Sequence, residues 1–541
     1  SADGTKLMFD SGFEGRETWL MNADGSNQHR LTSSSAASDE PSWSRDGRFV
    51  AFQSERDGNN EIYLIDAAVG ESRADTKAGQ TGPKSIAVLP FKTPGAEGDN
   101  QYLGAGMSDL LTTKLSQIRR LTVRPSGELR RYANSTADPR QAGRELGVDY
   151  LLDGEVRQSG DHLQVSATLF NVAGGSALWS EKFDQRFVNL RDVQDAISDR
   201  VVRAMTLELT SDERSQFTKN YTENREAYQL YLIGRYHAGK RTPEGLRQAV
   251  KSFEQAIEKD RNYALAYAGL ADAYGLLGLY DAVPSEQSFQ KSKEAATRAL
   301  AIDDTLAEAH NSLAFVKLYY DRDLAGAEEE FKTAIELKPN YSTAHHWHAL
   351  NLSAMGQHDQ AVAEIQKARE LDPLSLIINT AVGNILYYAG LYDRSIEQCL
   401  KTIQMDQRFV PAHIILRQNY EQKGMSDEAL AEYQKERALS GDGPVMAARL
   451  AHVYASAGRR DEALKIINGL VAARKQQFVS AYELARVFAV LGEDERALEW
   501  LRKARDEHAI GFSFVKVDPD FNRLRQHPLF TELLQQFGPT R

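Results

Sequence analysis

The sequence predicts an α+β multidomain protein, in which partial β-propeller blades precede a small mixed α/β domain and an all-α repeat solenoid. Three observations lead to this prediction. Near the start, apolar runs follow Asp-Gly turns that lie 43 residues apart, at Asp3-Gly4 and Asp46-Gly47. Strand-like and helix-like periodicities then alternate, and later five glycines recur every 34 residues. We therefore divide the chain into residues 1–70, 84–210 and 224–508, with a C-terminal capping segment at 509–541.

The composition narrows the classes of function. The 541 residues carry a net charge of −11. Because phosphate backbones are bound mainly by Lys and Arg, this region is not expected to bind nucleic acid. It contains no apolar run long enough to span a bilayer, so no membrane span is predicted. Cys399 is the only cysteine, which excludes an internal disulfide and a cysteine-based metal site.

Residues 1–70 alternate short strands with turn-forming residues. Gly15 and Gly58, in the turns after the first strands, are again 43 residues apart. Several short strands in a period of about 40–45 residues are typical of propeller blades. The stretches ADGSNQHRLT and PSWSRDGRFVAFQSERDGNNEIYLID closely resemble TolB-type β-propeller repeats. The resemblance covers fewer than two blades, which implies that further blades precede residue 1 or that this segment is a remnant.

Residues 84–210 follow the order β-α-β-α-β-β-β-α, which predicts a mixed α/β sandwich. Gly104 and Gly106 lie at a helix start, but the GxGxxG pattern is incomplete, so a backbone requirement is favoured over phosphate binding. The stretches SIAVLPF, GMSDLLTTKLSQI and RELGVDYLLDGEVRQSGDHLQVSATLFNVAGGSALWSEKFD resemble the TolB-like amino-terminal domain. In large bacterial signalling proteins this domain is joined to tetratricopeptide repeats. The resemblance implies that it is non-enzymatic here.

The glycines that recur every 34 residues are Gly356, Gly390, Gly424, Gly458 and Gly492. This period is that of tetratricopeptide repeats, each of which is a pair of antiparallel helices. The glycine is expected to end the first helix in a left-handed conformation. With irregular units from residue 224 onward, we count eight units. Gly239 and Gly278 are expected at helix ends, and Asp321 replaces the glycine in a third unit that is one residue longer.

The repeat phase also predicts which side chains face the concave surface, which first helices should line. Such a surface suits an extended peptide or a partner helix. The candidate partner-binding residues are His346, Leu350, Asn384, Tyr387, Tyr388, Gln418, His452, Tyr482 and Arg486. The alternative is that some of them pack between neighbouring units. Arrays that clamp a C-terminal carboxylate have Lys and Asn at set groove positions; only Asn384 is in place, so chaperone-tail recognition is not expected.

The run HHWH places His345 and His348 three residues apart on a predicted helix, where they could share a face. We expect no Asp, Glu or Cys on an adjacent turn. His310 and His413 share the repeat phase of His345, which favours a packing role over a metal site. The sequence contains no GxSxG, HExxH or Walker motif, so we predict no catalytic residue, metal or cofactor.

The leading hypothesis is a non-enzymatic protein–protein interaction and sensing region of a bacterial signal-transduction or transcription-regulatory protein. The resemblance implies that an effector precedes residue 1, such as a winged-helix DNA-binding domain, a kinase or a nucleotide cyclase. The alternative is a periplasmic assembly or scaffold factor related to TolB. An enzyme with an unrecognised site is a third hypothesis. The compartment stays open between the cytoplasm and the periplasmic part of an inner-membrane protein, and so do the partner and the oligomeric state.

Overall fold

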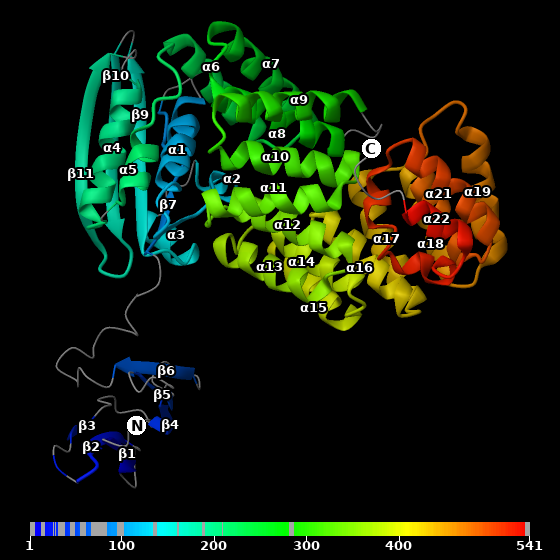
Figure 1. Cartoon of the computed structure of the whole chain (residues 1–541), viewed down its shortest axis with the longest axis horizontal. Coiled ribbons are helices and arrows are strands. Elements are labelled where there is room, and N and C mark those ends of the chain that lie inside the picture. Colours follow the sequence, from blue (N-terminus) through cyan, green and yellow to red (C-terminus); the bar gives the residue numbers. More distant parts are fainter. Residues whose placement is uncertain are drawn as a thin grey trace. The chain divides into compact units, whose positions relative to one another are not determined.

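The chain divides into two compact units, Ser1–Lys84 and Ser85–Arg541 (Figure 1). The computed structural model describes residues 84–94, 102–133, 138–159, 162–186, 190–207, 209–280 and 286–535, together with short stretches between residues 6 and 66. None of the helices in the described part of the chain is both long and apolar enough to cross a bilayer.

The first unit contains two three-stranded antiparallel sheets, β1-β2-β3 and β4-β5-β6. Their strands are β1 Lys6–Ser11, β2 Glu17–Asn22, β3 His29–Arg30, β4 Ser38–Trp43, β5 Phe49–Ser54 and β6 Glu61–Asp66. The first residues of β1 and β5 are 43 positions apart, which matches the predicted repeat. The turns predicted at Asp3-Gly4, Gly15, Asp46-Gly47 and Gly58 lie outside the described residues, and the propeller architecture stays a prediction.

The second unit begins with a five-stranded sheet of order β11-β10-β9-β7-β8. Its strands are β7 Lys84–Val88, β8 Leu121–Val123, β9 Tyr150–Ser159, β10 His162–Asn171 and β11 Ser176–Arg186. Strand β9 runs parallel to β7 and antiparallel to β10, so the sheet is mixed, as the order of elements predicts. Alternate residues of β10 from Leu163 to Leu169 are buried, which confirms the predicted alternation.

Helices cover both faces of this sheet. They are α1 Tyr102–Leu115, α2 Ser126–Leu129, the short 3₁₀ helix η3 Arg130–Tyr132, α3 Pro139–Glu145 and α4 Leu190–Ala204, followed by α5 Ser211–Thr218. The start of α1 approaches the end of β7 so closely that a Cβ atom on Gly104 would lie 2.0 Å from the Phe91 carbonyl oxygen. The glycine is therefore required by helix–strand packing, which supports the backbone explanation over phosphate binding.

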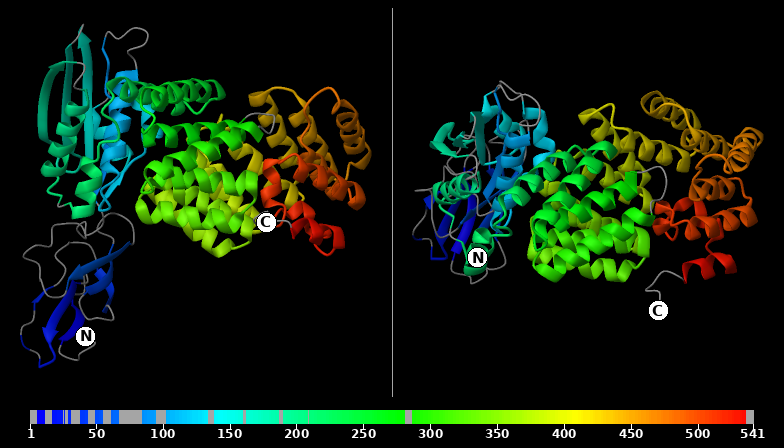
Figure 2. Two further views of the ribbon diagram at one scale, coloured as in Figure 1. Left: turned by 45° about the horizontal axis from the view of Figure 1, so that its top comes forward. Right: turned by 90° about the horizontal axis from the view of Figure 1, so that it is seen from above.

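The rest of the unit is a solenoid of the tetratricopeptide type, built from eight helix pairs among the described residues (Figures 1 and 2). The first helices are α6 Arg225–Ala238, α8 Ala264–Tyr280, α10 Ala307–Val316, α12 Ser342–Met355, α14 Leu376–Tyr388, α16 Val410–Gln422, α18 Pro444–Ser456 and α20 Ala481–Val490. The second helices are α7 Pro243–Lys259, α9 Glu286–Ile302, α11 Leu324–Leu337, α13 His358–Leu371, α15 Tyr392–Met405, α17 Ser426–Ser440, α19 Arg460–Ala473 and α21 Asp494–Asp506.

The five glycines spaced by 34 residues all follow first helices with φ between 69° and 82°, which confirms the predicted left-handed ends. Five residues beyond each glycine, the small side chain that begins the second helix is fully or almost fully buried, as at Ala361 and Ser395. Ser395 also donates a hydrogen bond of 2.6 Å to the Gly383 carbonyl on the facing helix. Small side chains at this position let the two helices of a unit approach closely.

In the irregular second and third units, the first helix ends without the regularly spaced glycine. The extra residue of the third unit is absorbed by the π-helical turn η5 Lys317–Asp321, and the left-handed conformation falls on Arg322 with φ 57°. The prediction that Gly278 ends its helix is wrong, because α8 continues to Tyr280. A Cβ atom on Gly278 would lie 2.8 Å from the Phe289 ring, so this glycine serves close packing of α8 against α9.

The α/β domain and the solenoid share one hydrophobic core. Helix α1 packs against α6, and the buried cluster runs from Met107 through Tyr231 to Phe253. Later units also contact the domain. Arg124 donates hydrogen bonds to the carbonyl oxygens of Glu370 and Leu371, the last residues of α13 in the fourth unit, at 3.0 and 2.8 Å.

We expect alanine substitution to change the free energy of unfolding in opposite directions at a repeat glycine and at a glycine inside a helix. Gly424→Ala should lower the free energy of unfolding by about 1 kcal/mol, because φ is +69° although the added methyl group has open space. Gly469→Ala, in the exposed interior of α19 and also with open space, should raise it by up to about 1 kcal/mol. Urea denaturation of the two variants measures both effects; equal shifts would refute the explanation.

Candidate protein-interaction groove

The nine predicted groove residues all lie on first helices, but most of them are not free to bind a partner in this structure. The buried members are His346, Leu350, Tyr387, His452, Tyr482 and Arg486. The partly exposed members are Asn384, Tyr388 and Gln418. Several of them contact the chain's own C-terminal segment, residues 509–534. The prediction that they bind an external partner stays untested, and their contacts show what holds them now.

The C-terminal segment consists of the 3₁₀ helices η6 Ile510–Phe514 and η7 Pro519–Leu524 and the helix α22 Pro528–Leu534. It contacts first helices from the third unit to the eighth. Ser513 donates to the Leu318 carbonyl at 2.8 Å, and Lys516 donates to the Met355 carbonyl at 3.0 Å. Phe514 stacks on Tyr388 with ring centroids 5.1 Å apart. The segment thus runs along the concave side of the solenoid.

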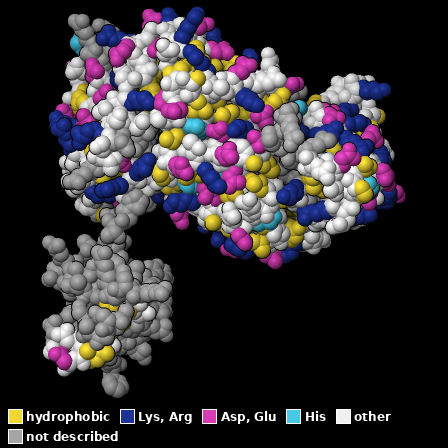
Figure 3. All heavy atoms as spheres, viewed as in Figure 1, with side chains coloured by type: hydrophobic (Ala, Val, Ile, Leu, Met, Phe, Trp, Pro, Cys, Tyr) yellow, Lys and Arg dark blue, Asp and Glu magenta, His cyan; other side chains and the backbone are white. Residues whose placement is uncertain are grey.

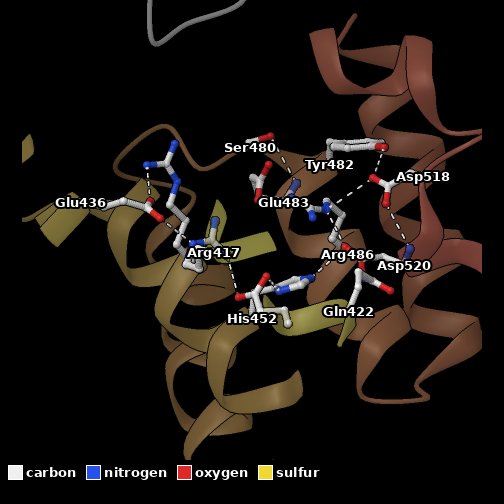
Figure 4. A network of polar contacts seen from close by, with 12 residues as sticks. Arg417, Gln422, Glu436, His452, Ser480, Tyr482, Glu483, Arg486, Asp518 and Asp520 are labelled. Atoms are coloured by element: carbon white, nitrogen blue, oxygen red, sulfur yellow. Dashed lines mark hydrogen bonds and ion pairs between the residues drawn. The ribbon is translucent and has the colours of Figure 1, made fainter. Parts of the chain in front are cut away.

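Two carboxylates at the start of η7, Asp518 and Asp520, contact three predicted groove residues (Figure 4). Arg486 Nε lies 2.7 Å from an oxygen of Asp520 and 3.4 Å from one of Asp518. The Tyr482 hydroxyl donates to Asp518 at 2.7 Å, and His452 Nε2 lies 2.8 Å from Asp520. All five side chains are buried. The predicted groove positions therefore bind an acidic segment that belongs to the same chain.

The network continues into the solenoid through neighbouring first helices. His452 Nδ1 lies 3.1 Å from Glu421, and Arg417 donates to Glu421 at 2.6 Å and to Glu436 at 2.8 Å. Gln422 donates to Asp520 at 2.7 Å. Because burying a charge without a partner is costly, each charged group here faces a group of opposite sign.

The electrostatics of the network follow from this pairing. Burial by itself lowers the pKa of His452, but the carboxylates of Asp520 and Glu421 outweigh burial and raise the pKa to about 9. Burial would raise the pKa of Asp520, yet Arg486 and His452 hold it well below its ordinary value. Burial raises the pKa of Asp518 to about 6, against the opposing effect of Arg486. At neutral pH His452 is therefore a cation between two carboxylates.

Apolar side chains anchor the same segment. Phe512, Val515, Phe521 and Phe530 are almost completely buried and join the core of the last two units. A Cβ atom on Gly511 would lie 2.4 Å from the Tyr482 ring, so the backbone approaches the solenoid directly. Each large apolar side chain contributes about 1.5–3 kcal/mol when it is buried. The segment is thus a built-in part of the fold, and the carboxyl-terminal part of the concave face is closed.

The histidines at one repeat phase have a common structural role. His310, His345 and His413 each place Nδ1 within 2.7 Å of a glutamate on the second helix, namely Glu330, Glu364 and Glu432. Each places Nε2 within 3.0 Å of the carbonyl oxygen six residues earlier in the chain. Each histidine therefore joins the loop between two units to the next helix pair, which supports the packing role.

No Asp, Glu or Cys lies on an adjacent turn of α12, as expected, but the facing helix α13 supplies a carboxylate to the HHWH run. Glu364, on the second helix of the unit, lies 2.6 Å from His345 and 3.2 Å from His348. Burial by itself would raise the pKa of Glu364. The two histidines outweigh burial and lower this pKa to about 2. Within the described ranges, however, no group of three or more His, Cys, Asp or Glu side chains is arranged to hold a metal ion.

The amino-terminal part of the concave face is different, because charged side chains there remain exposed. Asp272 lies six residues before Gly278, the same phase as Leu350, His452 and Arg486, and it is exposed to solvent. Surrounding protein nevertheless raises the pKa of Asp272, while Arg241 and Arg235 act in the opposite sense. The repeat phase could have identified Asp272, but the predicted residues begin only at the fourth unit.

Arg241 extends this open region across units. It is exposed, lies between α6 and α7, and hydrogen-bonds Tyr280 of α8. It is also near enough to His346 of α12 to act on its pKa, which burial and this cation lower to about 3. We define the open groove as Arg241, Asp272 and Tyr280, with the side chains between them. No sequence signal pointed to Arg241, because it lies in a turn outside the helical phase.

Parts of the chain are similar to known bacterial proteins. Residues 82–200 match the family described as HilA/YgeH-like transcriptional regulator, second domain. The chain is 23% identical over 335 residues to the transcriptional regulator HilA of Salmonella typhimurium, which covers 58% of this chain and 56% of HilA. It is 29% identical over 187 residues to putative adenylate cyclase 3 of Rhizobium meliloti, which covers 35% of this chain and 32% of that protein.

A third relative is a protein of the Tol-Pal system. The chain is 27% identical over 210 residues to the Tol-Pal system protein TolB of Alkalilimnicola ehrlichii, which covers 38% of this chain and 48% of TolB. The chain thus spans between about a third and somewhat more than half of the length of these three relatives.

The protonation of His452 predicts that stability falls at alkaline pH. A pKa raised from 6.5 to about 9 contributes stability that is fully present below about pH 6.5 and is lost as pH rises through 9. The loss can reach about 3 kcal/mol. Thermal unfolding at pH 7 and pH 10 should show a larger fall in Tm for the wild type than for His452→Gln. Equal falls in the two proteins would contradict the assignment.

Removing one carboxylate should loosen the C-terminal segment. Asp520→Ala leaves Arg486 and His452 buried without their closest partner, which should cost about 3–5 kcal/mol. Denaturant unfolding and limited proteolysis near residue 510 measure the effect. Asp506→Ala, which removes a largely exposed ion pair with Arg505, is the matched control and should change stability by less than about 1 kcal/mol. A similar loss in both variants would show that burial of the network is unimportant.

Proposed function

We propose that this chain is the partner-binding and sensing region of a bacterial transcription-regulatory or signalling protein. The observation that carries the proposal is the open groove. Arg241 and Asp272, from the first two units, are exposed there and their charges interact, while the rest of the concave face is covered by the C-terminal segment. Extended protein segments bind such surfaces through a series of polar contacts and side-chain pockets.

The neighbouring domain supports the regulatory part of the proposal. The match to HilA/YgeH-like regulators covers the α/β domain, and the similarity to HilA continues into the solenoid. Proteins of this organisation combine a region that binds partners with an effector elsewhere in the chain. We therefore assign this chain the non-enzymatic role, with the effector on another segment of the natural protein.

The partner should be a protein segment with charges of both signs. Arg241 and Asp272 offer a cation and a carboxylate within the same groove. On the face drawn in Figure 3, basic and acidic side chains are interspersed over the solenoid, and no broad basic area is seen among its described residues. This distribution favours a protein partner over nucleic acid, which selects surfaces of one sign.

A second candidate function is a scaffold factor of the bacterial envelope. The observation that favours it is the similarity to the Tol-Pal system protein TolB, which covers 38% of this chain. Cell fractionation of the natural protein distinguishes the two candidates. Recovery with periplasmic contents supports the scaffold, whereas recovery with the nucleoid or cytosol supports the regulator.

A photo-crosslinking amino acid at position 272 tests the open groove. In cells of the source organism it should form adducts with a specific partner, because Asp272 is an exposed side chain of the groove. The same amino acid at position 251 is the control, since Lys251 is an exposed residue of the second helix α7. Adducts of the same mass from both positions, or from neither, would contradict a groove that binds protein. Asp272→Ala should reduce co-purification of the captured partner several-fold.

A further inference from the structure

A cavity lies at the junction between the α/β domain and the first units of the solenoid. Its volume is about 90 Å³. It is lined by side chains from α1, α4, α5 and the first three units of the solenoid, among them Leu110, Gln194, Phe217, Tyr228, Tyr263 and Glu308. A ligand here would contact both parts of the unit at once. Cavities between packed substructures are common positions for small-molecule sites.

One wall of the cavity carries a polar group that the protein leaves without a partner. Tyr263 is 1% exposed, and among the described residues its hydroxyl has no hydrogen bond. The neighbouring tyrosines differ, because Tyr228 donates to Gln194 and the Tyr231 hydroxyl accepts from Arg235 at 3.1 Å. Burial raises the pKa of Tyr263 well above its ordinary value, so the hydroxyl keeps its proton. Tyr263 lines the cavity, so a ligand there could supply an acceptor for its hydroxyl.

The charges around the cavity favour an anion. Lys114 and Arg191 both face the carboxylate of Asp195, at 2.5 and 3.8 Å. The Asp195 carboxylate is thus the ion-pair partner of both Lys114 and Arg191. Arg191 and Tyr263 both line this cavity. A ligand carboxylate placed there could accept hydrogen bonds from both groups.

The apolar part of the lining and the volume of the cavity set the size of the ligand. The Phe217 ring lies 4.6 Å from Lys114 Nζ, and Leu110 and Leu265 add apolar surface beside polar side chains such as Asn220 and Glu308. A volume of about 90 Å³ equals that of about three water molecules in the liquid, and a dry 150 Å³ cavity accepts benzene. The apolar body of the ligand should therefore have about four carbon atoms, or slightly more if it extends through the mouth.

We propose that the junction cavity binds a small organic monocarboxylate, with its carboxylate at Tyr263 and Arg191 and its short apolar body against Phe217 and Leu110. This site is distinct from the open groove and does not depend on the partner proposed there. A bound carboxylate would tie α1 and α4 to the first units of the solenoid, because side chains of both parts line the cavity.

The test uses the full chain and two probes of equal shape. Butyrate carries the charge and butyramide does not. In calorimetric and ligand-observed NMR titrations, butyrate should bind saturably and at least about 10-fold more tightly than butyramide, because the amide lacks the charge that Arg191 and Lys114 face. Tyr263→Phe should weaken butyrate binding about 5-fold, the effect of one lost hydrogen bond. Arg191→Gln should weaken it further.

Two controls keep the outcome clear. Tyr263→Phe removes a hydroxyl that has no bond in the protein, so its Tm should match that of the wild type. Tyr267→Phe makes the same chemical change four residues later, on helix α8 and outside the cavity lining, and should bind butyrate like the wild type. The proposal is overturned if acetate, butyrate and benzoate all fail to bind saturably, if butyramide binds as well as butyrate, or if Tyr263→Phe binds unchanged. None of these results bears on the crosslinking test of the groove.

Discussion

The arrangement of the solenoid depends on one set of buried charges, those that join Asp518 and Asp520 to Arg486 and His452. Eight stacked helix pairs leave a concave surface whose first helices carry cationic and aromatic side chains. Left open, these side chains would face water; covered by an apolar segment alone, they would be buried without partners. The C-terminal segment covers them with two carboxylates and several aromatic rings, so charge and hydrophobic surface are satisfied together.

This closure divides the concave face into two functional regions. From the fifth unit onward, the groove residues are held by the same chain, and a partner would have to displace a segment anchored by Phe512, Phe521 and Phe530. The apolar burial makes that displacement costly. The first units lack such a cover, and Arg241 and Asp272 stay exposed. The open groove and the junction cavity therefore both lie in the amino-terminal half of the solenoid, next to the α/β domain.

Local sequence rules predicted most of the fold because the repeat imposes the same physical demands in every unit. A left-handed helix end needs glycine, and close helix pairs need Ala or Ser, so these residues mark the phase wherever the unit is regular. The sequence-based predictions were wrong where a residue is required by packing between helices rather than by local backbone conformation. Gly278 looks like a helix end but makes room for Phe289, and the extra residue near Asp321 became a π-helical turn. Neither outcome is visible in residue spacing.

The sequence by itself determined the repeat period, the helix pairs and the mixed sheet, because all of these follow from backbone conformation and periodic burial. Tertiary structure decided what the predicted groove side chains contact. Asp518 and Asp520 lie 32 to 68 positions from Arg486 and His452 in the chain, and the charge of Arg241, between α6 and α7, acts on His346 of α12 only because of how the units stack. Such pairings depend on the accumulated rotation of the units, which no local pattern encodes.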